Sequence, residues 1–152
     1  MSNPVDQSIG YLLADSARML RREFDARVRE LGMTGPQARL LLNLAVNEGE
    51  NQGFYAERLD VEPISLTRMI DRMEESGLLE RRRDPADRRA WRVHLTAGAR
   101  EVIEQVRSHA GPLQEMLLSG LDPAQRTALA SSLEVVRANL SAARETGIAA
   151  NG

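Results

Sequence analysis

One stretch in the middle of the chain constrains the fold more than any other. A helix is predicted to begin at Pro63, because proline suits the first helical position, and to end at Ser76-Gly77. Two strand-like segments follow at once, 78–83 and 91–95, separated by a polar Asp-Pro-Ala-Asp turn. A short helix is expected just before, over 54–59. Two short helices joined by a tight turn, with a β-hairpin directly behind them, predict a helix-turn-helix with a wing.

Longer helices are predicted on both sides of this unit. Apolar residues recur every three or four positions over 6–31, and Gly32 ends that helix. Thr34 is the expected N-cap of a largely apolar helix, within a Thr-x-x-Gln capping box. Two more helices are expected to start at the N-caps Thr96 and Asp122. The predicted fold class is mainly α with a small β-hairpin wing.

The terminal helices raise the question of assembly. An amphipathic helix at each end cannot easily bury its apolar stripe within a chain of 152 residues that has already closed its core. A homodimer in which the ends interleave would bury both stripes, and two-fold symmetry is the commonest kind. The alternative is that these helices pack back on their own subunit.

Composition narrows the class of protein. The absence of cysteine excludes disulfides, cysteine-based zinc sites and a thiol nucleophile within this chain. No apolar run approaches the ~20 residues of a membrane span, and the start lacks the layout of a secretory signal. We therefore expect a cytoplasmic protein with no membrane partner. His94 and His109 show no metal-binding spacing, and no catalytic motif is visible, so neither an enzyme, a metal site nor a cofactor is expected.

Charge is concentrated at the hairpin. The formal net charge of the chain is −2, so contact with nucleic acid would depend on a local positive patch. Residues 79–92 hold six arginines against three acids. In the helix that starts at Pro63, the apolar stripe leaves Ser65, Arg68 and Arg72 on the outer face. Short polar groups with arginines suit a helix in a major groove, although a solvated face with an incidental arginine pair is the alternative.

Several short motifs resemble the MarR/SlyA family of bacterial winged helix-turn-helix transcriptional regulators. They are Leu31-Gly32-Met33-Thr34 with Gln37, Leu66-Thr67-Arg68, Gly77-Leu78-Leu79, Asp84-Pro85-Ala86-Asp87-Arg88-Arg89, and Leu95-Thr96 followed by Gly98. The likeness covers most of residues 9–143. One departure is Glu62, a poor N-cap before Pro63.

The resemblance implies a single MarR-type domain over 1–152. Within it, 34–100 would form the winged helix-turn-helix core, and 6–31 and 97–146 the dimerisation helices. Arg89 would enter a minor groove while Asp87 holds the wing in shape. On physical grounds we expect Asp87 to do so by pairing with a neighbouring guanidinium, which would stiffen the loop. The full set of expected DNA-binding residues is Ser65, Thr67, Arg68, Arg72, Arg81, Arg83, Arg88 and Arg89.

The function implied is that of a homodimeric regulator, most often a repressor, bound to an inverted-repeat operator in double-stranded DNA. A small aromatic or phenolic effector would bind between the dimerisation helices and the winged helix, with Arg18, Arg22, Arg39 and His109 as its possible partners. The alternative is a winged helix that serves as a protein-interaction scaffold without sequence-specific DNA binding.

Overall fold

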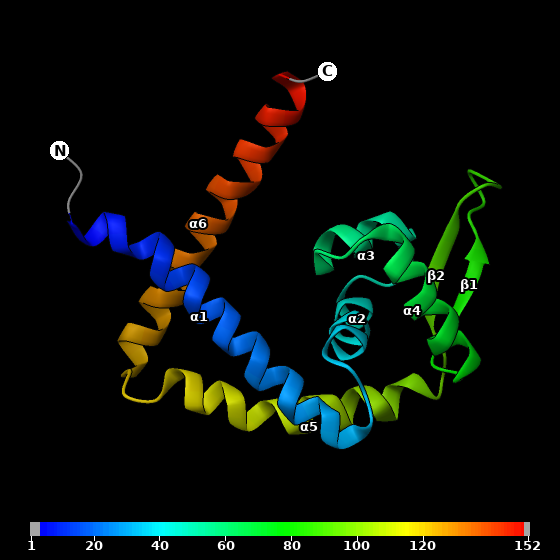
Figure 1. Cartoon of the computed structure of the whole chain (residues 1–152), viewed down its shortest axis with the longest axis horizontal. Coiled ribbons are helices and arrows are strands. Elements are labelled where there is room, and N and C mark those ends of the chain that lie inside the picture. The colour runs from blue at the N-terminus through cyan, green and yellow to red at the C-terminus, as the bar shows by residue number, and fades with distance from the viewer. Residues whose placement is uncertain (1–3, 151–152) are drawn as a thin grey trace. The chain divides into compact units, whose positions relative to one another are not determined.

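The computed structural model describes residues 4–150, with the side chains of all of these except 4, 6, 7 and 148–150. The elements are α1 (Pro4–Val28), the 3-10 turn η1 (Arg29–Leu31), α2 (Gly35–Val46), α3 (Gln52–Leu59), α4 (Pro63–Glu75), β1 (Leu79–Arg83), β2 (Trp91–Leu95), α5 (Ala99–Leu118) and α6 (Pro123–Ala150) (Figure 1). The fold is a winged helix-turn-helix that is mainly α with one two-stranded hairpin, as predicted. The chain divides into two compact units, one up to Leu113 and the other from Gln114.

Local sequence signals account for most helix ends. Gly32 adopts a left-handed φ of 72° and ends the first helical segment. Thr34 forms the expected capping box of α2 with Gln37. Pro63 opens α4, where the Glu62 side chain makes no capping hydrogen bond. These predictions are confirmed, and they rest on interactions between residues only a few positions apart.

The start of α5 differs from the prediction. The helix begins at Ala99, and the hydroxyl of Thr96 donates to the carbonyl of Gly77, 2.5 Å away, instead of capping the helix. Only the backbone carbonyl of Thr96 serves α5, accepting from the N–H of Ala99 at 3.2 Å. The hydroxyl thus joins the end of the hairpin to the turn after α4, a long-range contact that no local pattern announces.

The core of the first unit centres on α2. It packs against α1, α3 and β2, while α4 packs against α3 and β1. The buried side chains come from all of these elements and from α5; the largest are Tyr55, Leu40, Leu41, Leu44, Leu66, Ile70, Met73, Leu79, Val28, Val93 and Val106. The sequence predicts a largely apolar α2, but not all of its apolar side chains are buried: Val46, at the end of the helix, is 77% exposed.

The hairpin is held on both of its sides. β1 and β2 pair antiparallel, with Arg81 opposite Val93 and Arg83 opposite Trp91. On the edge of β2 that faces away from β1, Val93 forms backbone hydrogen bonds with the loop after α2: its N–H donates to the carbonyl of Glu50, and its carbonyl accepts from the N–H of Gly49. The wing is therefore built into the core through β2 rather than attached by its ends alone.

The second unit consists of the end of α5, a turn and α6. Asp122 and Gln125 form a reciprocal capping pair with two hydrogen bonds of 2.9 Å, as the predicted start of this helix requires. Arg126 closes the turn by donating to the carbonyls of Leu121 and Leu118. Among the described helices of both units, none has the length and apolar character to cross a membrane.

Candidate nucleic-acid interface

The outer face of α4 carries unpaired arginines. Leu66 and Ile70 are fully buried, and this places Ser65, Arg68 and Arg72 on the exposed side of the helix, as the spacing predicted. These three residues line a shallow cleft together with the first turn of α2. Within residues 4–150, the guanidinium groups of Arg68 and Arg72 form no hydrogen bond or ion pair. They are therefore available to an external partner.

Thr67 is placed differently from its neighbours on α4. Its side chain is half-buried, and its hydroxyl donates to the carbonyl of Pro63 at 3.0 Å. The same oxygen accepts from Nε2 of Gln52, on α3, at 3.2 Å. The hydroxyl thus already joins the two helices of the helix-turn-helix.

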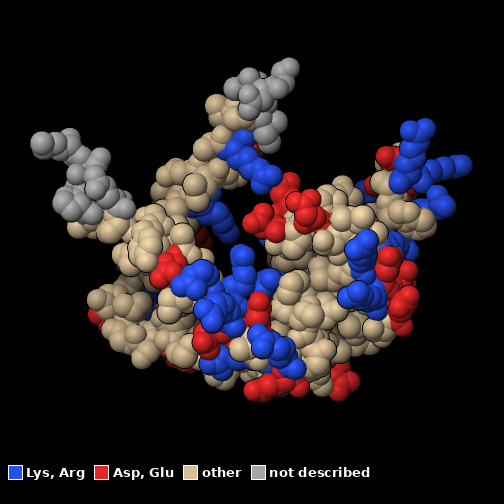
Figure 2. Space-filling view, viewed as in Figure 1, with Lys and Arg blue, Asp and Glu red and all other residues tan. Residues whose placement is uncertain are grey.

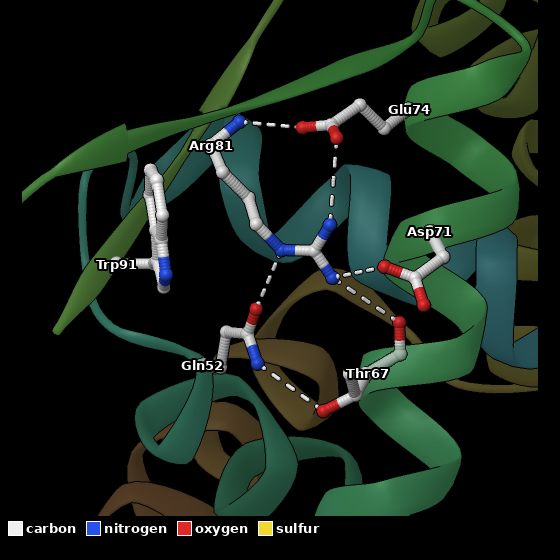
Figure 3. Close-up of a pocket in the computed structure, with 6 residues that line it drawn as sticks. All are labelled: Gln52, Thr67, Asp71, Glu74, Arg81 and Trp91. Atoms are coloured by element: carbon white, nitrogen blue, oxygen red, sulfur yellow. Dashed lines mark hydrogen bonds and ion pairs between the residues drawn. The ribbon is translucent and has the colours of Figure 1, made fainter. Parts of the chain in front are cut away.

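The side chain of Arg81 lies in a cleft against α3 and α4, and only 15% of it is exposed. Because Arg81 is opposite Val93, it shares the face of the hairpin that meets the core. Figure 3 shows its guanidinium among Gln52 of α3 and Thr67, Asp71 and Glu74 of α4, with Trp91 beside it. The distances are 2.7 Å from Nε to the Gln52 side-chain oxygen and 2.6 Å from Nη2 to Asp71 Oδ1.

The stem of the wing is stiffened by Arg83 and Trp91. The guanidinium carbon of Arg83 lies 4.8 Å from the centroid of the Trp91 ring, which is within the range of a cation–π contact. Nη1 of Arg83 also donates to the carbonyl of Arg88 at 3.0 Å. Trp91 is 39% exposed, and its ring packs on this arginine.

Two aspartates shape the tip of the wing. Oδ1 of Asp87 accepts the backbone N–H of Arg89 at 2.9 Å, and Oδ1 of Asp84 accepts that of Ala86 at 2.8 Å. Both contacts are Asx-type turns, in which a side chain replaces a backbone acceptor. The described part of the chain gives Asp87 no guanidinium partner, so the ion-pairing expected for it is not the contact that it makes. The ion pair belongs to Asp84, whose Oδ2 lies 3.1 Å from Nε of Arg92.

The charge state of Asp84 follows from these contacts. The Ala86 N–H and then the Arg92 guanidinium stabilise the ionised carboxylate, and together they hold the pKa of Asp84 below its ordinary value of 3.8. Beyond this aspartate, Arg88 and Arg89 are exposed, and basic side chains project from the hairpin tip in Figure 2. The tip is therefore an ordered turn that displays positive charge.

The four residues expected to bind an effector come from three helices: Arg18 and Arg22 from α1, Arg39 from α2 and His109 from α5. Arg18 pairs with Asp15 one turn away, and Arg39 pairs with Asp25 of α1 at 2.6 Å. The other two residues are His109, whose Nδ1 lies 3.0 Å from the Gln105 carbonyl, and the exposed Arg22. None of the four lines the cleft beside α4, the cleft around Arg81 or the hollow at the wing that Arg83, Asp84, Pro85 and Arg88 line.

Metal binding has no support in the described residues. Across 4–150, excluding the side chains left undescribed, no three histidine, aspartate or glutamate side chains are grouped as metal ligands would be.

Sequence reasoning missed Gln52 and Glu74 as members of this region, and it did not predict the ion pair between Asp84 and Arg92. Alternation along the hairpin offered a signal for the cluster around Arg81, because a buried Val93 and a directly opposed Arg81 must point to the same face. The spacing Asp-x-Ala over 84–86 is likewise typical of an Asx turn. Gln52 and Glu74 carried no comparable signal, since their contacts span 29 and 7 positions.

Comparisons with known proteins agree with this arrangement. The sequence model of the MarR family matches residues 33–91. The crystal structure of transcriptional regulator PA3341 is 32% identical, covers 87% of this chain and 97% of its own, and has a TM-score of 0.77. A MarR transcriptional regulator from Methanosarcina mazei Go1 is 26% identical, with coverages of 88% and 96% and a TM-score of 0.77.

A further likeness is to a mutant MarR from E. coli that was solved in complex with operator DNA. It is 26% identical, with coverages of 89% of this chain and 99% of that chain and a TM-score of 0.71. The helix-turn-helix, the basic wing and these likenesses together show that the chain belongs to the MarR family of winged helix-turn-helix transcriptional regulators.

Proposed function

We propose that this protein is a sequence-specific repressor, not an enzyme, that binds an inverted-repeat operator in double-stranded DNA as a homodimer. The observation that carries the proposal is that Arg68 and Arg72, on the outer face of α4, are exposed and form no ion pair with the described residues. Two more exposed arginines, Arg88 and Arg89, lie at the wing tip. A helix edge bearing arginine fits a major groove, and an arginine on a projecting turn fits a minor groove.

Each element has its own part in this proposal. Arg68 and Arg72 reach base edges from α4, with Ser65 near the backbone, and Arg89 enters the adjacent minor groove. Arg83 and Arg88 contact phosphates. Arg83 donates one N–H group to the Arg88 carbonyl and uses its remaining N–H groups for the phosphate. We assign Thr67 an indirect part, because its hydroxyl already has two partners.

Exposed apolar side chains on the terminal helices support the homodimer. On α1 they include Ile9, Leu12 and Leu20, and on α6 they include Leu129, Leu133 and Leu140. Side chains of this size on one helix face normally meet a partner, and a two-fold dimer would cover both copies equally. Introducing a charge at Leu12 or Leu133 should halve the mass measured by sedimentation, and an unchanged mass would contradict the dimer. In such a dimer the half-site centres lie about 34 Å apart.

We also propose that a small aromatic or phenolic acid relieves the repression. Family membership supports the class of effector, and it must bind one of two dimer shapes more tightly in order to shift the equilibrium between them. Of the four arginine and histidine candidates, Arg22 is the most available, because Arg18 and Arg39 pair with acids and His109 contacts the Gln105 carbonyl. A thermal-shift series of aromatic carboxylates tests this, with Arg22→Ala as the variant that should lose the shift.

DNA binding is tested by titrating a labelled duplex at several salt concentrations. Each neutralised phosphate should contribute about −0.9 to the slope of log affinity against log salt. Arg68→Ala and Arg89→Ala should each weaken binding by about 1–3 kcal/mol, because each removes a base-reading arginine. Arg107→Ala is the control, since Arg107 pairs with Glu104 on α5 and lies outside the interface. A protein-interaction scaffold would instead show a flat salt response and equal binding by all variants.

A further inference from the structure

The side chain of Arg81 connects three elements at one point. It extends from β1, its Nε donates to Gln52 of α3, and its Nη2 donates to Asp71 of α4 and, at 3.3 Å, to the carbonyl of Thr67. Its Nη1 lies 3.4 Å from Oε1 of Glu74, whose other oxygen accepts the backbone N–H of Arg81 at 2.8 Å. Each edge of the planar guanidinium therefore faces a different partner (Figure 3).

The charges around Arg81 leave it little to offer a phosphate. Its side chain is only 15% exposed, and two carboxylates, Asp71 and Glu74, already neutralise it. Moving the guanidinium to DNA would leave these two acids unpaired on the same face of α4, three positions apart, where like charges repel. In the protein without DNA, the Arg81 guanidinium is therefore more stable between Asp71 and Glu74 than turned out toward solvent.

The contacts also fix the orientation of the wing relative to α4. Gln52 accepts from Arg81 with its oxygen and donates to the Thr67 hydroxyl with its nitrogen, so α3, α4 and β1 share one chain of hydrogen bonds. A lysine ammonium carries its donors on a single atom and cannot reproduce the fork that spans these partners. The wing cannot tilt away from α4 without breaking several of these contacts together.

We propose that Arg81 is a positioning residue that sets the wing at one orientation relative to α4, so that the elements for the major and minor grooves meet DNA in register, and that it does not contact phosphate. This inference rests on the proposed DNA-binding function and replaces the phosphate contact expected for Arg81 from its charge. A prearranged wing needs less ordering when DNA binds, and Arg81 would contribute to the affinity by lowering this cost.

The test compares Arg81→Gln and Asp71→Asn with two matched controls. Arg82→Gln and Glu80→Gln make the same chemical changes at a neighbouring ion pair on the other face of the hairpin. Binding to the most enriched duplex from a random-sequence library is measured at several salt concentrations. Trp91, the sole tryptophan, lines the cleft around Arg81, so its emission reports the cleft in the absence of DNA.

We expect Arg81→Gln and Asp71→Asn each to weaken binding about tenfold, with the salt slope unchanged and Trp91 emission shifted. The sign for Asp71→Asn is decisive, because removing an acid from α4 would tighten binding if electrostatics alone operated. Glu80→Gln should not weaken binding, and both controls should keep the wild-type emission. Melting temperatures separate misfolding from misplacement: Arg81→Lys, which keeps the charge, should also bind weakly while remaining folded.

Two other results would overturn the inference in different ways. If Arg81→Gln lowers the salt slope by about one contact and Asp71→Asn tightens binding, Arg81 is a phosphate contact and the proposed function stands. If the wild-type protein binds no duplex, the proposed function fails and the positioning role falls with it.

Discussion

The carboxylate of Asp84 joins β2 to the turn at the wing tip, with Oδ2 3.1 Å from Nε of Arg92 and Oδ1 2.8 Å from the backbone N–H of Ala86. One side chain thus holds both the second strand and the turn. The backbone N–H of Asp84 adds a hydrogen bond of 3.0 Å to the carbonyl of Ala90, which closes the loop at its base. The shape of the tip depends on this acid in the midst of arginines.

Asp84→Ala should weaken DNA binding although it makes the wing more positive. The substitution frees Arg92 and opens the turn, so the tip must be ordered again when DNA binds. We expect a loss of about tenfold in affinity, from one charged and one neutral hydrogen bond, measured by anisotropy at fixed salt. Tighter binding by this variant would show that net charge, not shape, governs the wing.

The same contacts predict how the wing responds to pH. Because the pKa of Asp84 is lowered in the folded protein, its stabilising effect is fully present above the ordinary value of 3.8 and is lost as the pH falls through the lower, folded-state value. The wing should therefore keep its shape from neutral pH down to that value. Trp91 emission followed during acidification should change below it, and Asp84→Ala should lack that step.

Asp87 offers a comparison between an acceptor and a charge. Its Oδ1 accepts the N–H of Arg89, and an asparagine oxygen could accept the same bond. Asp87→Asn should therefore bind DNA nearly as well as the wild type, whereas Asp87→Ala should bind about threefold to tenfold more weakly. Equal losses in the two variants would mean that the negative charge of Asp87 is what the wing requires.

A methyl group at Gly35 would collide with the Asp25 carboxylate. A Cβ at this position would lie 1.7 Å from Oδ1 of Asp25, the oxygen that pairs with Arg39 at 2.6 Å. Gly35→Ala must therefore displace Asp25 and break its ion pair with Arg39 of α2. We expect a loss of about 1–3 kcal/mol in the free energy of unfolding, measured by urea denaturation.

Gly10→Ala is the matched control for this prediction. Gly10 lies inside α1 with no atom within 4 Å of an added Cβ, so alanine should raise helix stability by about 0.5–1 kcal/mol. Equal stability of the two alanine variants would mean that displacing Asp25 from Arg39 costs the fold nothing, and the prediction for Gly35 would be wrong.

The parts of the fold that could be predicted from the sequence are those that depend on contacts between residues close together in the chain. The capping box at Thr34, the left-handed Gly32 and the proline at the start of α4 each involve residues within a few positions of one another. The alternating apolar positions of β2 likewise located the hairpin. Such signals survive in a single sequence, because no distant partner is needed to explain them.

The parts that did not follow depend on partners far along the chain. The Thr96 hydroxyl was expected to cap α5, but its partner is Gly77, nineteen positions earlier. Arg81 was grouped with the other wing arginines by charge, yet its direction is set by the register with Val93 and by Gln52. Charge and spacing locate the basic hairpin, and only tertiary contacts decide which arginines face inward.

The central claim, that α4 and the wing read DNA as a two-fold pair, is tested most directly by selecting bound duplexes from a random-sequence library. The account predicts an enriched motif made of two inverted half-sites, with centres about one helical turn, or roughly 34 Å, apart. Arg68→Ala should relax the motif at the positions read in the major groove. Recovery of unenriched sequences, or of a motif without two-fold symmetry, would contradict the account.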